Sequence, residues 1–143
     1  MMVDITSKRM VRREATAYGR IKLKEETLEA IRSGKVKKGD VFTVARIAAI
    51  QAVKDTPKII PLCHPIPITG IDVSFDLSDD SVSVTVTVRT IAQTGVEMEA
   101  LSGVMAALLN IWDMVKYLEK DESGNYPLTK IEEVRVLKKV KGD

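Results

Sequence analysis

The 143-residue sequence predicts a single α+β domain built around an antiparallel sheet. The segments Ile71–Leu77 and Val82–Val88 each place an apolar side chain at every second position, and Asp79 and Asp80 between them predict a turn. Residues 94–120 form a long segment that is apolar almost all round in its middle, which is typical of a buried helix. A hairpin with one apolar face and a helix to cover that face indicate the α+β class.

In chain order, the expected elements are a strand over 14–23, helices over 24–34 and 40–54, the hairpin strands 71–77 and 82–88, the long helix and a strand over 128–140. Gly34 is expected just past the C-cap of the first helix, and Asp40 is expected to cap the second. The order β-α-α-β-β-α-β is the split βαβ, ferredoxin-like arrangement with an extra helix. We therefore expect an antiparallel sheet with helices packed on one face.

Composition narrows the class of protein. A net charge of +2 is too small to indicate bulk nucleic-acid binding, and no apolar run approaches the ~20 residues that span a bilayer. The N-terminus lacks the apolar region of a signal peptide, and a single cysteine cannot form an internal disulfide, so a cytoplasmic location is expected. Basic residues gather in 8–13 and 138–141. They are either solvated or fold over a polyanionic ligand, and residues 1–13 are expected to form a mobile arm.

The stretch "PLCHPIPIT", residues 61–69, holds the only cysteine, Cys63, and the only histidine, His64. Zinc needs four ligands, usually in spaced pairs, and no second pair exists, so no metal site is expected. Neighbours in an extended loop point apart, which disfavours a catalytic Cys–His pair. His64 is then either a structural histidine in a turn or a ligand-binding group in a loop stiffened by prolines.

The long helix carries acidic residues near both ends. Thr94 and Glu97 fit a capping box, whereas Glu99 has no such explanation and lies in a helix expected to be buried. Asp113 and Lys116 share a helix face at i,i+3 spacing. They are either a surface ion pair or, because apolar residues flank the aspartate, a pair whose pKa values move toward neutrality for acid–base chemistry.

Five stretches, "MVDIT", "KKGDVFTVARIAAIQAVK", "IPLCHPIPI", "TGVEMEAL" and "IWDMVK", occur in one order and spacing. In this they closely resemble the molybdenum cofactor biosynthesis protein C (MoaC) family, the cyclic pyranopterin monophosphate synthases. The resemblance covers about residues 2–139. It implies a ferredoxin-like fold and a homo-hexamer, a trimer of dimers with active sites at subunit interfaces. It also implies conversion of 3′,8-cyclo-7,8-dihydro-GTP to cyclic pyranopterin monophosphate with release of pyrophosphate, an activity of the phosphorus–oxygen lyase type.

The resemblance also assigns residues. Asp113 and Lys116 are expected to be catalytic, moving protons during ring opening and closing. The substrate-binding residues are expected to be Leu62, Cys63, His64, Glu97, Met98, Glu99, Lys38 and Lys139. The family's C-terminal lysine aligns with Lys139, but Lys138 and Lys141 stay open as alternatives. No cofactor is expected, and the sequence leaves open whether Mg²⁺ accompanies the phosphates.

Helix geometry adds one constraint on this site. Glu99 and Asp113 are fourteen positions apart, which is about 21 Å along a continuous helix and within about 40° of the same face. If both belong to one site, either the helix breaks, for instance at Gly103, or two chains build the site. The alternative function is a non-catalytic nucleotide- or pterin-sensing module on the same scaffold, which would bind substrate without releasing pyrophosphate.

Overall fold

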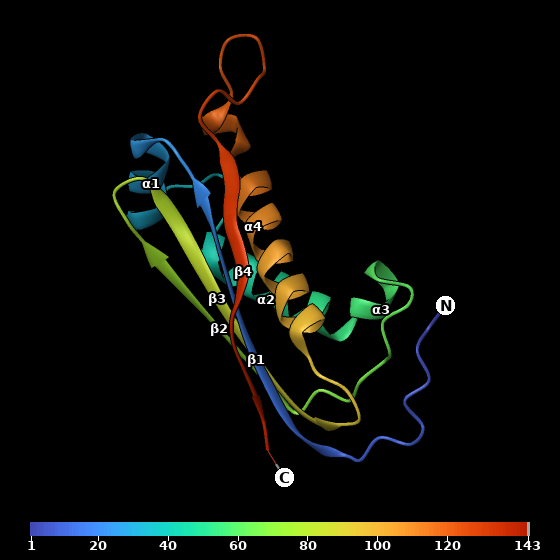
Figure 1. Cartoon of the computed structure of the whole chain (residues 1–143). Helices are drawn as coiled ribbons and strands as arrows, with labels where there is room; N and C mark the ends of the chain where they lie inside the picture. The colour runs from blue at the N-terminus through green and yellow to red at the C-terminus, as the bar shows by residue number, and fades with distance from the viewer. Residues whose placement is uncertain (143) are drawn as a thin grey trace.

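The computed structural model describes residues 1–142 and contains four strands and four helices (Figure 1). In chain order the elements are β1 (Val11–Lys22), α1 (Glu25–Arg32), α2 (Val41–Lys54), α3 (Thr56–Ile59), β2 (Gly70–Leu77), β3 (Ser81–Ala92), α4 (Glu97–Glu119) and β4 (Lys130–Lys141). The expected order of strands and helices is confirmed, with one additional short helix, α3.

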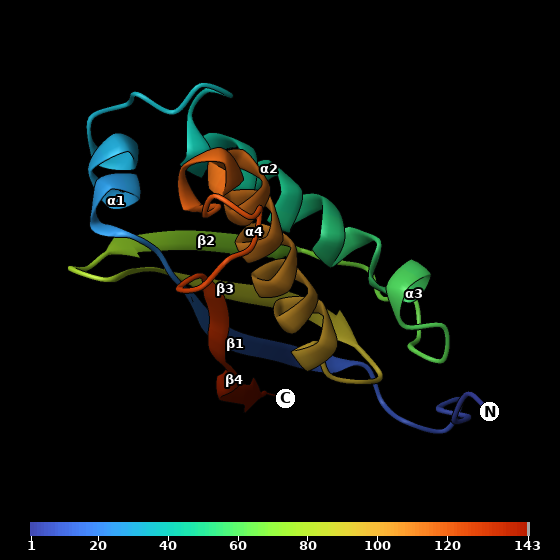
Figure 2. The same cartoon turned by 90° about the horizontal axis from the view of Figure 1, so that it is seen from above.

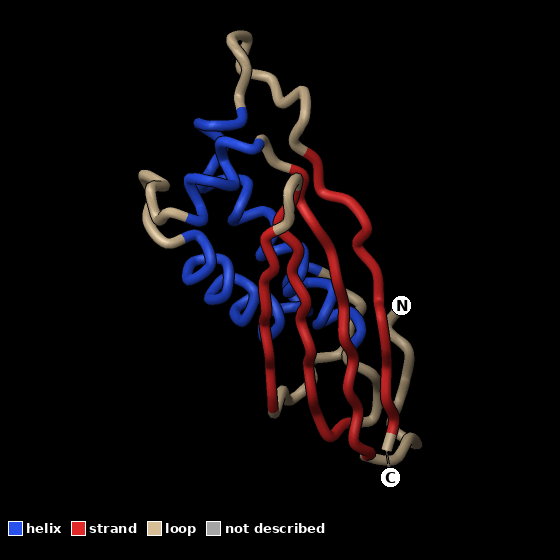
Figure 3. The backbone as a smooth tube through the Cα atoms, turned by 90° about the vertical axis from the view of Figure 1, so that its left-hand side faces the viewer, coloured by secondary structure: helices blue, strands red, loops and turns tan. Residues whose placement is uncertain are grey.

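The four strands form one antiparallel sheet in the order β2-β3-β1-β4. Helices α1, α2 and α4 lie on one side of this sheet (Figure 2), and Figure 3 shows the strands side by side with the helices gathered to that side. The expected hairpin is confirmed, since Val73 pairs with Val86 and Phe75 with Val84. The fold is therefore the α+β, ferredoxin-like arrangement that the sequence predicts.

Alternation along the strands determines which face is buried. Val82, Val84, Val86 and Val88 of β3 have no exposed surface and point toward the helices, whereas the residues between them face away. Their partners in the core come from β1 and from α4, where Leu108 is also fully buried. The opposite face of the sheet carries mostly polar side chains.

Two glycines allow α4 to approach its neighbours closely. A Cβ added to Gly19 of β1 would lie 2.8 Å from Val104 on α4, and one added to Gly103 would lie 2.9 Å from Val53 on α2. Gly103 therefore serves packing, and α4 runs unbroken through it from residue 97 to residue 119. The alternative in which the helix breaks at Gly103 is wrong.

Both expected helix signals beside the loop 33–40 are confirmed. Gly34 has φ +71° and follows the C-cap Ser33, and its N–H donates to the carbonyl of Ile31 at 3.3 Å. The Asp40 side chain accepts a hydrogen bond from the N–H of Thr43 at 3.0 Å. These caps fix where the loop leaves α1 and enters α2.

The capping box expected at the start of α4 is wrong. The helix begins at Glu97 after the N-cap Val96, and no side chain caps it. Glu97 is thus the first helical residue, whereas a capping-box glutamate must be the third. Strand β1 also begins earlier than expected, at Val11, because that residue is buried and pairs with Ala92, so the N-terminal arm is shorter than the expected 1–13.

Within residues 1–142, α4 is the one helix that is long enough and apolar enough to cross a membrane, when only length and composition are considered. It packs against the sheet and α2, and more than half of its most apolar window is buried inside the domain. This burial explains the apolar composition, as the sequence predicts for a core helix.

Candidate functional site

The residues that the sequence analysis singles out fall into two groups, one at each end of α4. Asp113, Lys116 and Lys38 gather near the C-terminal end of the helix. Residues 62–64, residues 97–99 and Lys139 lie at its N-terminal end. The structure thus brings together residues that are far apart in sequence, but into two clusters.

Asp113 is the centre of the first cluster. One carboxylate oxygen contacts Lys38 Nζ at 3.0 Å, and the other contacts Lys116 Nζ at 3.2 Å. Lys38 also donates to the backbone carbonyl of Asp113 at 3.2 Å. Two ammonium groups therefore flank one carboxylate, and because all three side chains are about half exposed, a ligand can reach them.

The environment of Asp113 differs from the apolar one expected from its flanking residues. Its side chain is 57% exposed, because Ile111, Met114 and Val115 point into the core on the other side of the helix. The hydrogen bonds from Lys38 and then Lys116 lower the pKa of this carboxyl below its ordinary value of 3.8. Of the two alternatives left open by the sequence, the surface ion pair of Asp113 with Lys116 is confirmed, the shift of the Asp113 pKa toward neutrality is wrong, and the group is held ionised.

Lys38 reaches Asp113 because its loop is tied to α4. The backbone N–H of Lys37 donates to Tyr117 Oη at 2.9 Å, and the Lys37 ammonium lies 5.2 Å from the centre of the Tyr117 ring. Gly39 has φ +116°, which turns the chain into the N-cap Asp40. The sequence analysis missed Tyr117. Its position one helical turn beyond Asp113 was the only available signal.

Glu99 dominates the second cluster. Its side chain is only 1% exposed, and it accepts a hydrogen bond from the Cys63 thiol at 3.7 Å. Burial raises the pKa of Glu99, and burial followed by the negative charge of Glu99 raises the pKa of Cys63. The second carboxylate oxygen, Oε1, is buried without a hydrogen-bond partner among the described residues. An unpartnered buried oxygen at this position favours a protonated carboxyl or a bound donor.

The structure distinguishes among the three C-terminal lysines. Lys139 pairs with Ala15 on β1, so it faces the helices, and its ammonium lies 3.4 Å from Glu97. Lys138 pairs with Thr16 and faces the opposite side of the sheet. Lys141 faces the helices but pairs with Arg13 at the far end of the strand. Of the three, Lys139 is the one paired with a residue of the second cluster.

His64, Leu62 and Met98 complete this cluster. The Nε2 atom of His64 lies 2.6 Å from the backbone carbonyl of Val3 in the N-terminal arm. Leu62 and Met98, the sequence neighbours of Cys63 and Glu99, are exposed apolar side chains. The sequence analysis did not anticipate that the arm would reach His64, although "MVDIT" was one of the stretches that carried the resemblance.

One chain does not join the two clusters. Because α4 is continuous, Glu99 and Asp113 stay about 21 Å apart along its axis. Each cluster contains acidic and basic groups, but neither contains all the residues expected to meet one substrate.

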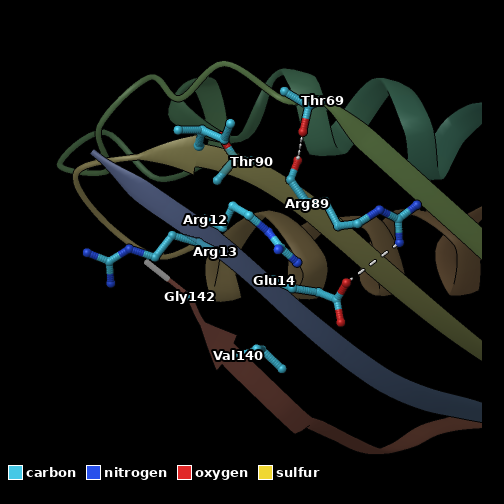
Figure 4. A pocket seen from close by; sticks show the side chains of 9 residues that line it. Arg12, Arg13, Glu14, Thr69, Arg89, Thr90, Val140 and Gly142 are labelled. Atoms are coloured by element: carbon cyan, nitrogen blue, oxygen red, sulfur yellow. Dashed lines mark hydrogen bonds and ion pairs between the residues drawn. The ribbon is translucent and has the colours of Figure 1, made fainter. Parts of the chain in front are cut away.

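A separate hollow lies on the sheet face away from the helices (Figure 4). Its charged lining comes from Arg12, Arg13, Glu14 and Arg89, and Arg89 is already paired with Asp72 at 2.7 Å. None of the residues expected at the site lines this hollow, so it is separate from both clusters. Within residues 1–142, no group of three or more His, Cys, Asp or Glu side chains is arranged to hold a metal ion.

Comparison with known proteins gives concordant matches. Residues 2–142 match the model of the MoaC family. The chain is 58% identical over 142 residues to a protein of Thermococcus kodakarensis and 61% identical over 141 residues to one of Methanosarcina mazei, each named probable cyclic pyranopterin monophosphate synthase. The alignments cover 99% of this chain and 91% and 90% of those relatives. A protein of Methanothermobacter thermautotrophicus, 59% identical over 98% of this chain and 88% of its own length, is named probable cyclic pyranopterin monophosphate synthase accessory protein.

Proposed function

The chain belongs to the MoaC family, and we propose that it converts 3′,8-cyclo-7,8-dihydro-GTP into cyclic pyranopterin monophosphate with release of pyrophosphate. This makes it an enzyme of molybdenum cofactor biosynthesis, of the phosphorus–oxygen lyase type. The observation that carries the proposal is the cluster in which Lys38 and Lys116 flank Asp113. Such a cluster offers an anionic nucleotide two ammonium groups and a carboxylate within reach of solvent.

The lysines suit the phosphate chemistry. The substrate carries a triphosphate, and the product keeps one phosphate as a cyclic ester. A ribose hydroxyl oxygen forms a bond to the α-phosphorus and releases its proton to water. The bond between the α-phosphorus and the bridging oxygen breaks, and its electron pair leaves with pyrophosphate. Ammonium groups of Lys38, Lys116 and Lys139 stabilise the charge on that leaving group, and positioning supplies much of the remaining rate enhancement.

The carboxyls suit different proton-transfer roles. Asp113 has a lowered pKa, so it is a weak base, and in this proposal it orients Lys116, whose ammonium supplies a proton. Glu99 has a raised pKa, so it retains a proton at pH values where Asp113 has lost its own. The two carboxyls therefore have different roles in this proposal: Asp113 orients Lys116, and Glu99 holds a proton. Glu97, Met98, Cys63, Leu62 and His64 would hold the substrate beside Glu99.

We further propose that each active site combines the Glu99 cluster of one chain with the Asp113 cluster of its partner. The unbroken α4 supports this, because the ~21 Å between the clusters exceeds the reach of one reacting centre. A two-fold axis across α4 would bring opposite ends of two copies together and form two equal sites. The hexamer implied by the resemblance would contain three such dimers, and native mass spectrometry should then give six times the chain mass of 15.8 kDa.

A complementation experiment tests the composite site. Glu99→Gln and Asp113→Asn chains, each inactive alone, are co-expressed with different tags and purified as mixed dimers. Each mixed dimer contains one intact site and one doubly altered site, so pyrophosphate release should return to about half of the wild-type rate. The matched control pairs Asp113→Asn chains of both tags, which should stay inactive. Inactive mixed dimers of confirmed composition would refute the composite site.

Turnover by the purified chain tests the reaction itself. Release of pyrophosphate from the cyclised dihydro-GTP, with formation of cyclic pyranopterin monophosphate, is the expected result. Binding without release would instead support the sensing module. Addition of EDTA should leave the rate unchanged, since the proposal assigns no bound metal. A loss restored by Mg²⁺ would show that the cation accompanies the phosphates. A cytoplasmic location is also proposed, because the substrate is a free nucleotide derivative.

A further inference from the structure

The N-terminal arm, Met1–Met10, is held against the second cluster by two side chains, of which one, Gln93, has no role in the proposed reaction. The first is Gln93, in the turn between β3 and α4, whose side-chain amide donates to the backbone carbonyls of Ile5 at 3.3 Å, Thr6 at 3.5 Å and Lys8 at 3.2 Å. The second is His64, whose Nε2 lies 2.6 Å from the Val3 carbonyl. Gln93 thus holds the part of the arm that directly follows Val3, the residue that contacts His64.

The Val3 contact determines which nitrogen of His64 carries the proton. A backbone carbonyl can only accept, so Nε2 must be the donor. In the neutral imidazole, Nδ1 is then a hydrogen-bond acceptor. Nδ1 has no hydrogen-bond partner among residues 1–142. The arm therefore leaves one lone pair of His64 available to a ligand.

We propose that Gln93 is a positioning residue that acts through the arm, fixing His64 as an acceptor toward the substrate. This inference rests on the proposed function, since the ligand is taken to be the nucleotide-derived substrate. An unprotonated Nδ1 cannot donate to a phosphate oxygen. Instead it binds an O–H or N–H group, such as a ribose hydroxyl or an amine of the base. The lysines bind the phosphates, and His64 recognises the sugar–base part of the substrate.

The free protein provides a test that does not depend on turnover. His64 is the only histidine, so protein labelled with ¹⁵N-histidine gives the imidazole signals of this one residue. At pH 8 the spectrum should show a protonated Nε2 whose N–H exchanges slowly with water, and an unprotonated Nδ1. Gln93→Ala should make that N–H exchange too fast to observe and should increase hydrogen–deuterium exchange in residues 3–8.

Two matched variants make the test specific. Gln93→Lys places an ammonium group where it can donate to the same carbonyls, so it should restore the slow Nε2–H signal. Gln51→Ala removes an exposed glutamine of α2 and should leave the wild-type spectrum unchanged. A proton on Nδ1 in the wild type, or a Gln93→Ala spectrum identical to that of wild type, would overturn the inference.

Kinetics with the cyclised dihydro-GTP test the link to substrate. Gln93→Ala should raise KM about 2- to 10-fold with little change in kcat, as expected for one loosened hydrogen bond to a neutral group. Gln93→Lys should restore KM. If the arm moves in the spectra while KM stays at the wild-type value, the positioning role is wrong. If wild-type protein releases no pyrophosphate, the proposed function fails, while the spectra still decide how the arm holds His64.

Discussion

Replacing Asp113 by Asn should separate a catalytic role from a structural one. The substitution keeps the shape of the side chain and removes its charge, so it weakens two ion pairs, with Lys38 at 3.0 Å and with Lys116 at 3.2 Å. Because both pairs are exposed to solvent, each contributes about 0–1 kcal/mol to the free energy of unfolding. The hydrogen bond from Lys38 to the Asp113 carbonyl survives. We therefore expect a loss of about 2 kcal/mol or less in total, or at most roughly 8 °C in Tm.

Turnover should respond far more strongly. Loss of a group that orients a proton donor in the transition state costs about 10²- to 10⁴-fold in rate. Urea unfolding and calorimetry measure the loss of stability, and pyrophosphate release per folded chain measures the loss of turnover. Asp76→Asn on β2, another exposed aspartate, is the control and should change neither quantity. A folded Asp113→Asn enzyme with near wild-type turnover would remove Asp113 from the mechanism.

Three further changes have definite expected outcomes. Lys38→Met removes the largest cause of the lowered Asp113 pKa. The pKa of Asp113 should therefore rise toward 3.8, and carboxyl ¹³C NMR should show the carboxylate taking up its proton at higher pH. An unchanged pKa would contradict the geometry. Lys139→Ala should weaken substrate binding with an effect that shrinks as salt rises, whereas Lys138→Ala, on the other sheet face, should not; the reverse result would show that the C-terminal alignment is wrong. Glu119→Ala should destabilise the fold by about 3–5 kcal/mol in urea unfolding, because this buried carboxylate accepts from a backbone N–H and two threonine hydroxyls; a loss below about 1 kcal/mol would refute that reasoning.

The fold was predictable because its signals are local. Alternating valines in β3, the cap at Asp40 and the glycine after α1 each depend on a few neighbouring residues, and all were confirmed. The start of α4 was mispredicted, since Thr94 and Glu97 have the right spacing for a capping box and only the backbone shows where the helix begins. Helix α3 is four residues long, too short for any periodicity to appear in the sequence.

The sequence names candidate site residues but does not give their contacts. Apolar flanks suggested a buried Asp113, but in a helix those flanks point to another side, so the carboxylate is exposed. The approach of Lys38 to Asp113 spans 75 positions, and that of His64 to Val3 spans 61. Contacts of this kind depend on how helices and loops pack, and no local pattern records them.

The unbroken course of α4 has a consequence for how this chain can evolve. If α4 sets the distance between the Glu99 cluster and the Asp113 cluster, the number of residues from 99 to 113 matters more than their identity. One inserted residue would rotate everything beyond it by about 100° and move it by about 1.5 Å, turning Asp113 away from the face it shares with Glu99. A seven-residue insertion would nearly restore the angle but would lengthen the helix by about 10 Å. Substitutions that keep the packing should therefore be tolerated along this segment, whereas insertions and deletions should be excluded from it.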